Sequence, residues 1–438
     1  MDPDQDREID SMKSSFLDPG SRRHTLPPVR SPPRASSTST ARVTARGRAR
    51  VAAGQVWVYR QDVLDGPKTD ARQGGPDVVQ VTDERGKPLA VATWAAESPV
   101  ALRVLDLARP TEQGSNGLPN LLQLVEDRFA RALAFRRGLA LDRDAFRVVH
   151  GESDGLPGLI VDAYADAAVV QSTSVAMDAQ KVEIAELVAR RLGAHMIVVR
   201  DDGSARDFEG LPRKAEVLVG QGSTIVEYRL GPNRLVADLL GDSKTGGFLD
   251  QADNHALVAG LAPANARGLD AFTYHGGFAL ALARKGGQVL ATDEDSQAVE
   301  RARANAARNG LANLEVRQAN AFDLLRSLEA ARERFDVVVL DPPAFAKRKS
   351  GGLAAERAYR EIILRGLRLA APGGLVVPCS CSGRVSREQF DAIVAQAAAD
   401  SGRQAQLLAR MGAGRDHPEL VGVPETGHLK CWVLRVIR

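Results

Sequence analysis

The C-terminal half of this chain alternates between short apolar runs and longer helical segments, beginning at about Pro232. Strand candidates cover residues 267–272, 288–292, 314–317, 335–340, 374–378 and 431–436. Helical segments fit between them, notably at 296–309, 354–369 and 386–399. Strands that alternate with helices are typical of a parallel sheet with helices on both faces. The sequence therefore predicts an α/β fold, with a doubly wound, Rossmann-like sheet over residues 232–438.

Two motifs follow neighbouring strand candidates in this region. Asp341 begins an Asp-Pro-Pro-Ala-Phe motif directly after the apolar run 336–340, and a Pro-Cys-Ser-Cys-Ser-Gly motif follows at 378–383. A buried parallel strand that ends in this way places a carboxylate at the carboxyl edge of the sheet, where α/β proteins bind ligands. A thiol on a nearby strand end would complete a pair of nucleophile and proton donor.

A ligand-binding pattern also appears in the first half of this region. The first strand candidate runs through Asp270 into a turn with Gly276 and Gly277, and the next strand ends at Asp293. Glycines let the backbone approach a ligand, a helix start offers free N–H groups, and an acid at the second strand can bind a ribose. Because the turn is not Gly-x-Gly-x-x-Gly, this pattern indicates S-adenosylmethionine rather than a dinucleotide. After the third strand, Asn320 is placed to hydrogen-bond the adenine edge.

Each of these features also has a purely structural interpretation. Taken singly, the two glycines fit a tight turn, and Asp293 fits a helix N-cap. The order of all the pieces along the chain favours the cofactor.

The rest of the chain is organised differently. Short strand candidates with turns between them lie at 55–59, 78–82, 89–93 and 100–105. Their close spacing predicts a small β-barrel module over residues 46–115. A central α+β domain is predicted over residues 116–231. Its expected elements are a helix at 121–137, hairpin-like strands around 155–158 and a helix at about 179–191.

The N-terminal segment 1–45 predicts a disordered tail rich in Arg, Pro and Ser. Eight arginines and no acidic residue lie between Ser21 and Arg50. Such a composition cannot bury enough apolar surface to fold. The tail is either a plain extension or an arm that steers RNA through its phosphates.

Composition indicates the number of domains and the cellular compartment of this chain. Its 438 residues are enough for two or three domains, and a net charge of +3 argues neither for nor against nucleic acid. Three cysteines are too few for a disulfide framework, and we find no membrane-length apolar run or secretion signal. We therefore expect a soluble, cytoplasmic protein without a membrane partner.

From about residue 46 to its end, the chain resembles the bacterial 23S ribosomal RNA (cytosine-C5) methyltransferases. These combine a PUA domain, a central α+β domain and a class I S-adenosylmethionine-dependent methyltransferase domain. The segments that carry the resemblance are 151–158, 244–251, 272–278, 341–345, 380–383 and 416–418. The resemblance implies a PUA-like RNA-binding domain at 46–115 and, as partner, 23S RNA that is naked or partly assembled. The oligomeric state stays open, with a homodimer as one alternative.

The resemblance also implies roles for individual residues. The implied cofactor-binding residues are Gln251, Asp270, Phe272, Tyr274, Gly276, Gly277, Asp293, Asn320 and Asp341. Cys381 is implied as the nucleophile that adds to C6 of cytosine, so that C5 can attack the methyl group. Asp341 would protonate or hydrogen-bond N3. Asp416 and His417 are candidates for the base that removes the C5 proton.

The sequence departs from the family pattern in two places. Asn320 stands where many relatives have an acid, and Cys379 is an additional thiol. We expect Cys379 to be structural and Cys431 to lie in the core. A zinc site made of Cys379, Cys381, His428 and Cys431 matches no usual spacing, so we expect no metal.

Two other functions compete with cytosine methylation. An RNA guanine N-methyltransferase would need no thiol, because a nitrogen lone pair attacks the methyl group directly. A non-catalytic RNA-binding assembly factor could retain the pocket without turnover. The Ser-Cys-Ser-Gly segment at 380–383 favours the cytosine reaction.

Overall fold

The computed structural model describes residues 39–67, 77–107, 118–345 and 352–438. Most of the predicted tail therefore lies outside the described residues, but its predicted end at residue 45 is wrong. Strand β1 (Thr40–Val43) pairs with β4 (Val78–Thr82) and with β3 (Val63–Asp65). Ala41 and Val43 are fully buried, whereas Arg42 between them points to the surface and pairs with Asp65. The surrounding arginines conceal this short alternation in the sequence.

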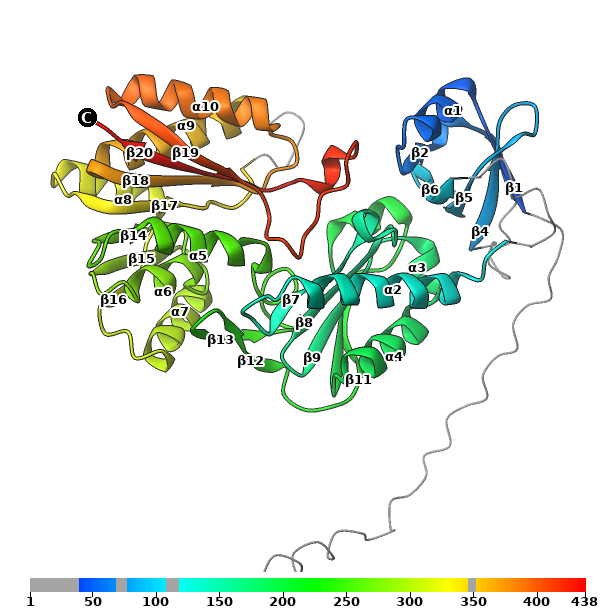
Figure 1. Cartoon of the computed structure of the whole chain (residues 1–438), viewed down its shortest axis with the longest axis horizontal. Coiled ribbons are helices and arrows are strands. Elements are labelled where there is room, and N and C mark those ends of the chain that lie inside the picture. Colours follow the sequence, from blue (N-terminus) through cyan, green and yellow to red (C-terminus); the bar gives the residue numbers. More distant parts are fainter. Residues whose placement is uncertain (1–38, 68–76, 108–117, 346–351) are drawn as a thin grey trace, which may run out of the picture. The chain divides into compact units, whose positions relative to one another are not determined.

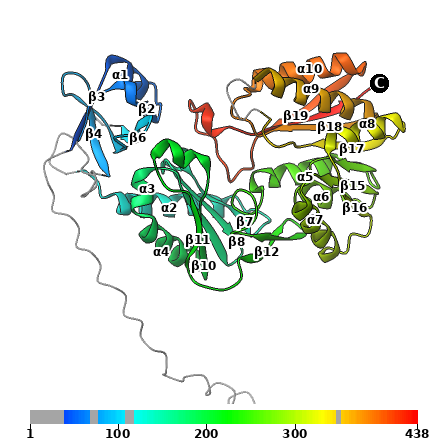
Figure 2. The same cartoon turned by 180° about the vertical axis from the view of Figure 1, so that it is seen from behind.

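The N-terminal sheet contains six strands in the order β2-β6-β5-β4-β1-β3. The remaining elements are β2 (Trp57–Tyr59), β5 (Pro88–Trp94), β6 (Val100–Leu107) and helix α1 (Ala45–Ala52). The four strands expected from the sequence are present. Helix α1 lies beside the strands of this sheet (Figure 2). Val51 of α1 packs in one apolar core with Val58 and Val81 of the strands.

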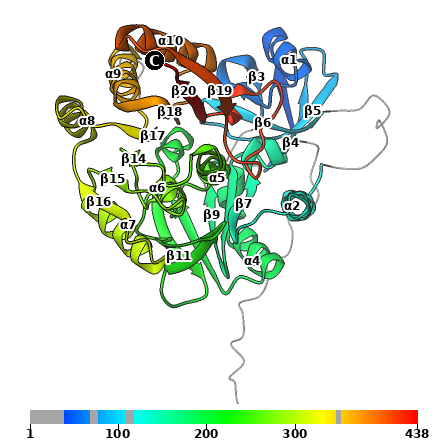
Figure 3. The same cartoon turned by 60° about the vertical axis from the view of Figure 1, so that its left-hand side comes forward.

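The central region contains a five-stranded sheet in the order β11-β10-β9-β8-β7. Its strands are β7 (Ala145–His150), β8 (Leu159–Tyr164), β9 (Ala167–Ser172), β10 (Met196–Asp201) and β11 (Lys214–Val219). Its helices are α2 (Leu121–Gly138), α3 (Val175–Ala179) and α4 (Lys181–Leu192). Phe129 of α2 and Leu187 of α4 share one core with the sheet, and both helices lie beside it in Figure 3. A two-stranded ribbon follows, formed by β12 (Ile225–Leu230) and β13 (Asn233–Asp238).

The C-terminal sheet has seven strands in the order β16-β15-β14-β17-β18-β20-β19 (Figure 1). They are β14 (Gly268–Asp270), β15 (Val289–Asp293), β16 (Leu314–Gln318), β17 (Phe335–Leu340), β18 (Ala370–Ser380), β19 (Ala405–Met411) and β20 (Lys430–Val436). Strands β14 to β18 are parallel, and β20 runs antiparallel to both β18 and β19. This is the doubly wound sheet that the sequence predicts, extended by β19.

Within the described residues, six helices cover the two faces of this sheet. They are α5 (Ala252–Leu261), α6 (Gly277–Ala283), α7 (Ser296–Arg308), α8 (Ala321–Ala330), α9 (Gly352–Leu369) and α10 (Arg387–Ser401). Val337 and Val339 of β17 join the core that includes α5, α6 and α7. Val338 and Leu340 join the core that includes α8, α9 and α10. Because both faces of β17 are covered, its run from Val337 to Leu340 is continuously apolar.

Within the described ranges, no helix combines enough length with enough apolar character to cross a membrane.

Candidate active site

A cavity of about 350 Å³ lies at the carboxyl ends of the parallel strands. Eight of the ten predicted site residues line it, namely Gln251, Phe272, Tyr274, Gly277, Asp293, Asn320, Asp341 and Cys381. They come together because Asp293 ends β15, whereas Asp341 and Cys381 directly follow β17 and β18. The other two do not line the cavity: Asp270 is the last residue of β14, and Gly276 lies in the turn that follows and caps α6.

Asp270 is a buried carboxyl group with one free oxygen. Its Oδ2 accepts hydrogen bonds from Oγ1 of Thr273 at 2.8 Å and from the backbone N of Ala279 at 3.1 Å. Its Oδ1 is buried and has no hydrogen-bond partner among the described residues. Burial raises the pKa of Asp270 to about 7, and the charge of Asp293 adds to this effect. A free buried oxygen of this kind suits a cationic or N–H-bearing ligand group.

The two glycines at the start of α6 are explained by the local structure. Gly276 caps this helix with a φ of +92°, a conformation that favours glycine. A Cβ on Gly277 would stand 2.3 Å from Cε1 of His255. Both glycines are therefore required by the local backbone and packing, in addition to any ligand contact.

The two polar residues predicted for the ribose and the adenine are held by their own backbone contacts. Asp293 accepts hydrogen bonds from the N of Tyr274 at 2.8 Å and from the N of Asp295 at 3.1 Å. The N-cap of α7 is Asp295, so Asp293 is not the cap and its carboxylate lines the cavity. Asn320 caps α8 and accepts from the N of Phe322 at 3.0 Å. Its amide oxygen is thus engaged, while its NH₂ group donates a long hydrogen bond of 3.5 Å to Oε2 of Glu294 and has a second N–H that could reach an adenine.

Aromatic side chains form one wall of the cavity. The ring of Tyr274 stacks on His275 with centroids 3.7 Å apart and meets Phe248 edge-on at 4.7 Å. The hydroxyl oxygen of Tyr274 accepts a hydrogen bond from the N of Ser243 at 3.0 Å. Tyr274 has a φ of +49°, which is unusual for a residue with a side chain.

Asp341 is the predicted proton donor. Its Oδ2 accepts a hydrogen bond from Nε2 of Gln251 at 2.9 Å. Burial raises the pKa of Asp341 to about 7, and the charges of Asp250 and Asp270 act in the same direction. Near neutral pH, a substantial fraction of Asp341 therefore carries a proton, as an acid in this position requires.

Cys381 differs from the other two cysteines in its exposure. Cys379 and Cys431 are cross-strand neighbours in β18 and β20 and are fully buried, whereas Cys381 is partly exposed and lines the cavity. Burial raises the pKa of the Cys381 thiol, the charge of Lys244 opposes this, and Asp341 raises it further. The partly exposed thiol is the one that a ligand in the cavity can reach.

Lys244 and Asp250 also line the cavity. Both belong to the segment 244–251 that carries the family resemblance, but no role was predicted for either. Nζ of Lys244 lies 3.3 Å from Oδ2 of Asp250 and 4.1 Å from the centroid of the Phe248 ring. Although burial alone would raise the pKa of Asp250, the charge of Lys244 and the hydrogen bond from His428 hold it well below its usual range. The cavity therefore contains an ionised carboxylate beside the more readily protonated Asp341.

Sequence reasoning also missed Lys430, the first residue of β20. This side chain is buried, and its Nζ donates hydrogen bonds to the carbonyl oxygens of Ser382 at 2.6 Å and His428 at 2.8 Å. Burial lowers the pKa of Lys430 to about 8, although the charge of Cys381 opposes this. Lys430 thereby fixes the backbone that follows the thiol.

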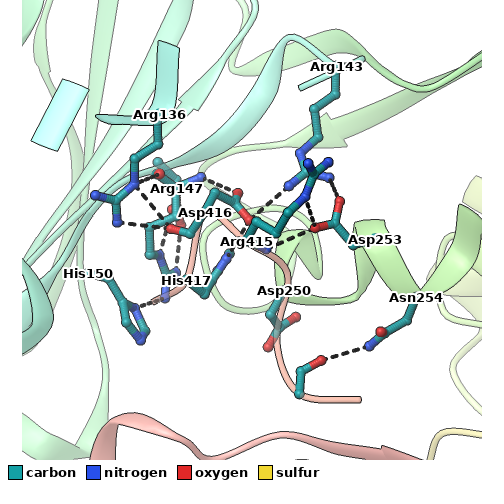
Figure 4. Close-up of polar contacts among 12 residues, drawn as sticks. Arg136, Arg143, Arg147, His150, Asp250, Asp253, Asn254, Arg415, Asp416 and His417 are labelled. Carbon is teal, nitrogen blue, oxygen red and sulfur yellow. Dashed lines mark hydrogen bonds and ion pairs between the residues drawn. The ribbon is translucent and has the colours of Figure 1, made fainter. Parts of the chain in front are cut away.

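The structure argues against Asp416 and His417 as the base. Neither lines the cavity; both lie in a buried cluster with arginines of the central region (Figure 4). The carboxylate of Asp416 accepts from Nη2 of Arg143 at 2.9 Å and from the N of Arg147 at 2.9 Å. Burial alone would raise the pKa of Asp416, but its contacts with His417 and Arg143 lower it to about 2. A carboxylate that is fully engaged and so weakly basic is a poor proton acceptor.

No group of three or more His, Cys, Asp or Glu residues suited to a metal ion is found in the described part of the chain.

Comparison with known proteins identifies two regions of the chain. Residues 41–107 match the model of a PUA-like domain, and residues 263–414 match that of a methyltransferase domain. A solved structure assigned as a SAM-dependent methyltransferase from Streptococcus mutans superposes with a TM-score of 0.75 at 16% identity. It covers 91% of this chain and 100% of its own. A second methyltransferase, solved in complex with SAH, has a TM-score of 0.73 at 17% identity and the same coverage.

Curated relatives are more similar in sequence. Ribosomal RNA large subunit methyltransferase I of Tolumonas auensis is 35% identical over 388 residues, which are 87% of this chain and 95% of that protein. The enzyme of the same name from Aeromonas hydrophila is also 35% identical, over 86% of this chain and 94% of its own length. The methyltransferase fold and the free carboxyl oxygen of Asp270 fit S-adenosylmethionine as the cofactor. The chain belongs to the ribosomal RNA large subunit methyltransferase I family.

Proposed function

We propose that this protein transfers a methyl group from S-adenosylmethionine to C5 of a cytosine in 23S ribosomal RNA, through a covalent adduct on Cys381. One observation carries the proposal: a partly exposed thiol and a carboxyl group with a raised pKa line the same cavity as the predicted cofactor residues. The relatives of the same family, which are named as ribosomal RNA methyltransferases, support RNA as the substrate class.

In this proposal, the cavity has one part for the methyl donor and another for the methyl acceptor. We propose that Asp293 and Asn320 hold the ribose and the adenine, while the Asp270 turn holds the methionine end. S-adenosylmethionine supplies the electrophilic methyl group when it is bound there. Cys381 and Asp341 stand on the neighbouring strand ends and would face the cytosine.

Cys381 would act as the nucleophile. Its Sγ forms a bond to C6 while the C5=C6 double bond opens, and the electron pair makes C5 reactive toward the methyl group. After methyl transfer, C5 gives its proton to a water molecule in the cavity, the double bond forms again and Sγ leaves as the thiolate. The raised pKa of the Cys381 thiol makes it a strong nucleophile once it is deprotonated.

Asp341 would control the proton at N3. Addition at C6 pushes electrons toward N3, so that a proton or a strong hydrogen bond must be supplied there. A carboxyl group with a pKa of about 7 can give this proton at neutral pH and take it back when Sγ leaves. The hydrogen bond from Gln251 holds the carboxyl group in place.

The PUA-like domain is proposed to contact the RNA beside its target. A base within a paired helix would have to leave its stack before Cys381 could reach C6. Naked or partly assembled RNA is therefore the proposed substrate, because the target helix is then open to deformation.

The test uses the purified protein and a Cys381→Ala variant. Both are incubated with radiolabelled S-adenosylmethionine and 23S RNA that lacks modifications, and the labelled nucleoside is then identified. We expect 5-methylcytidine with the unaltered protein and none with the variant. Label on guanosine, or 5-methylcytidine that persists in the variant, would overturn the proposal.

A further inference from the structure

A chain of hydrogen bonds connects the backbone of Gly412 with the carboxyl group of Asp341. Nδ2 of Asn254 donates to the carbonyl oxygen of Gly412 at 3.0 Å and to Oε1 of Gln251 at 2.6 Å. Nε2 of Gln251 then donates to Oδ2 of Asp341 at 2.9 Å. Asn254 and Gln251 are both buried. Two amide groups thus stand between a fixed carbonyl and the predicted acid.

The carbonyl group of Gly412 determines the orientation of both amides. A backbone carbonyl can only accept, so the NH₂ group of Asn254 must face Gly412. Because the same NH₂ group also faces Gln251, the latter must present its oxygen to Asn254. The NH₂ group of Gln251 is therefore left for Asp341. Reversal of either amide would place two donors or two acceptors against each other.

This orientation decides where a proton on Asp341 can lie. Oδ2 of Asp341 accepts a hydrogen bond from Gln251, so the proton of the neutral acid belongs on Oδ1. Several other titratable groups also influence this carboxyl group: Asp250, Asp270, Lys244, Cys379, Cys381 and Tyr359. Among the described residues, Gln251 is the one that donates a hydrogen bond to it.

We propose that Asn254 is a positioning residue that orients Gln251 and thereby keeps the proton of Asp341 on Oδ1, free for the substrate. The inference rests on the proposed function, in which Asp341 serves N3 of cytosine. Asn254 touches neither the substrate nor the cofactor in this proposal and acts only through Gln251.

The starting carbonyl belongs to a segment that the central region holds. Gly412 follows β19, and Gly414 donates its N–H to the carbonyl oxygen of Asp250 at 2.8 Å. Arg136 donates to the carbonyl oxygen of Asp416 at 2.9 Å, and Figure 4 shows Asn254 close to the same segment. The relay therefore begins on backbone that is anchored on two sides.

The first test needs no turnover and measures unfolding by urea as a function of pH in the full chain. Asn254→Ala frees the Gln251 amide to turn, so that the ionised Asp341 loses a fixed donor. We expect the substitution to lower the ratio of folded to unfolded protein at both pH values. The factor of this loss should be about tenfold greater at pH 8 than at pH 5.5, because only the ionised carboxylate needs the donor. In an Asp341→Asn background, the pH dependence of this loss should disappear.

A matched control separates positioning from mere packing. Asn305 is another buried amide, which accepts from the N of Val236 and donates to the carbonyl oxygen of His275. Asn305→Ala should cost stability equally at both pH values. A pH-independent loss for Asn254→Ala, or a pH-dependent loss that persists with Asp341→Asn, would overturn the relay.

The second test measures methyl transfer to 23S RNA in single turnover between pH 5.5 and 9. In Asn254→Ala, we expect the rate to begin its fall at a higher pH than in the unaltered protein. The maximal rate should also be about tenfold lower. With Gln251→Leu already present, Asn254→Ala should have no further effect, and an additional effect would contradict the relay. Absence of 5-methylcytidine with the unaltered protein would overturn the proposed function instead, while the unfolding result would still decide the relay.

Discussion

The carboxylate of Asp416 accepts a hydrogen bond at 2.9 Å from Nη2 of Arg143, a residue more than 270 positions earlier in the chain. Both side chains are buried, with exposures of 0% and 5%. Arg143 also pairs with Asp253 at 2.6 Å, and Arg136 binds the backbone of Asp416. The connection between β19 and β20 is thus attached to the central region by buried, hydrogen-bonded charges (Figure 4).

We expect Asp416→Ala to destabilise the protein by about 3 kcal/mol, as measured by urea denaturation at pH 7. Removal of one partner of a buried ion pair leaves the other charge without compensation, which typically costs about 3–5 kcal/mol. The lower value applies because Arg143 keeps Asp253 as a second partner. The exposed pair of Asp207 and Arg213 provides the control, and Asp207→Ala should change stability little. Similar losses for the two variants would contradict a special role of the buried cluster.

The sequence predicted most accurately those strands whose two faces are both covered by helices. The prediction for β17 matches the structure at both ends, because all the residues it buries are apolar. Strand β19 was not predicted, since it lies beside β20 at the edge of the sheet and all of its side chains are partly or fully exposed. The predicted helix at 179–191 is divided between α3 and α4, with Gln180 outside both helices.

The candidate site was predictable to the extent that strand ends determine it. Asp293, Asp341 and Cys381 meet because parallel strands present their carboxyl ends at one edge. The roles of Asn254 and Lys430 depend on contacts with distant backbone, which local sequence patterns do not encode. The Asp416 motif was recognised as part of the resemblance, but only the structure reveals its arginine partners.

A mechanism-based probe should capture the proposed nucleophile. RNA with 5-fluorocytidine at the target position allows thiol addition and methyl transfer, but fluorine cannot leave C5 as a proton does. We expect a covalent protein–RNA complex that survives a denaturing gel and is absent with Cys381→Ala. Cys379→Ala is the matched control, because this buried thiol lies two residues earlier in the chain and should not be needed. An adduct that depends on Cys379 instead would refute the assignment.

Lys244 should control the reactivity of Cys381. The positive charge of Lys244 opposes the effect of burial on the thiol, so Lys244→Met should raise the pKa of Cys381 further. Below its pKa, a thiol loses about tenfold in thiolate for each unit of increase. We expect alkylation of Cys381 by iodoacetamide at pH 8, followed by peptide mass spectrometry, to slow about 3–10-fold.

Two further variants test the role of the charge. Lys244→Arg keeps the charge and should retain most of the reactivity, whereas the exposed Lys87→Met should have no effect. Unchanged alkylation in Lys244→Met would show that the Lys244 charge does not act on the thiol.

Asp270 should lower the free energy of unfolding at neutral pH and should strengthen cofactor binding. The pKa of this carboxyl group is raised from 3.8 to about 7 in the folded state, mainly by burial. Between these values the folded protein keeps a proton that the unfolded chain releases, so the free energy of unfolding falls as pH rises from about 4 to 7. The neutral amide of Asp270→Asn removes this dependence and can still accept from Thr273 and Ala279.

We therefore expect Asp270→Asn to be more stable than the unaltered protein by about 1–3 kcal/mol at pH 8, and of similar stability at pH 4, when both are unfolded in urea without cofactor. The same variant should bind S-adenosylmethionine at least about tenfold more weakly in calorimetric titration, because the free Oδ1 is replaced by a donor. A loss of stability at both pH values would show that hydrogen bonds to the carboxylate outweigh its burial. Unchanged cofactor affinity would instead place the methionine end of the ligand away from Asp270.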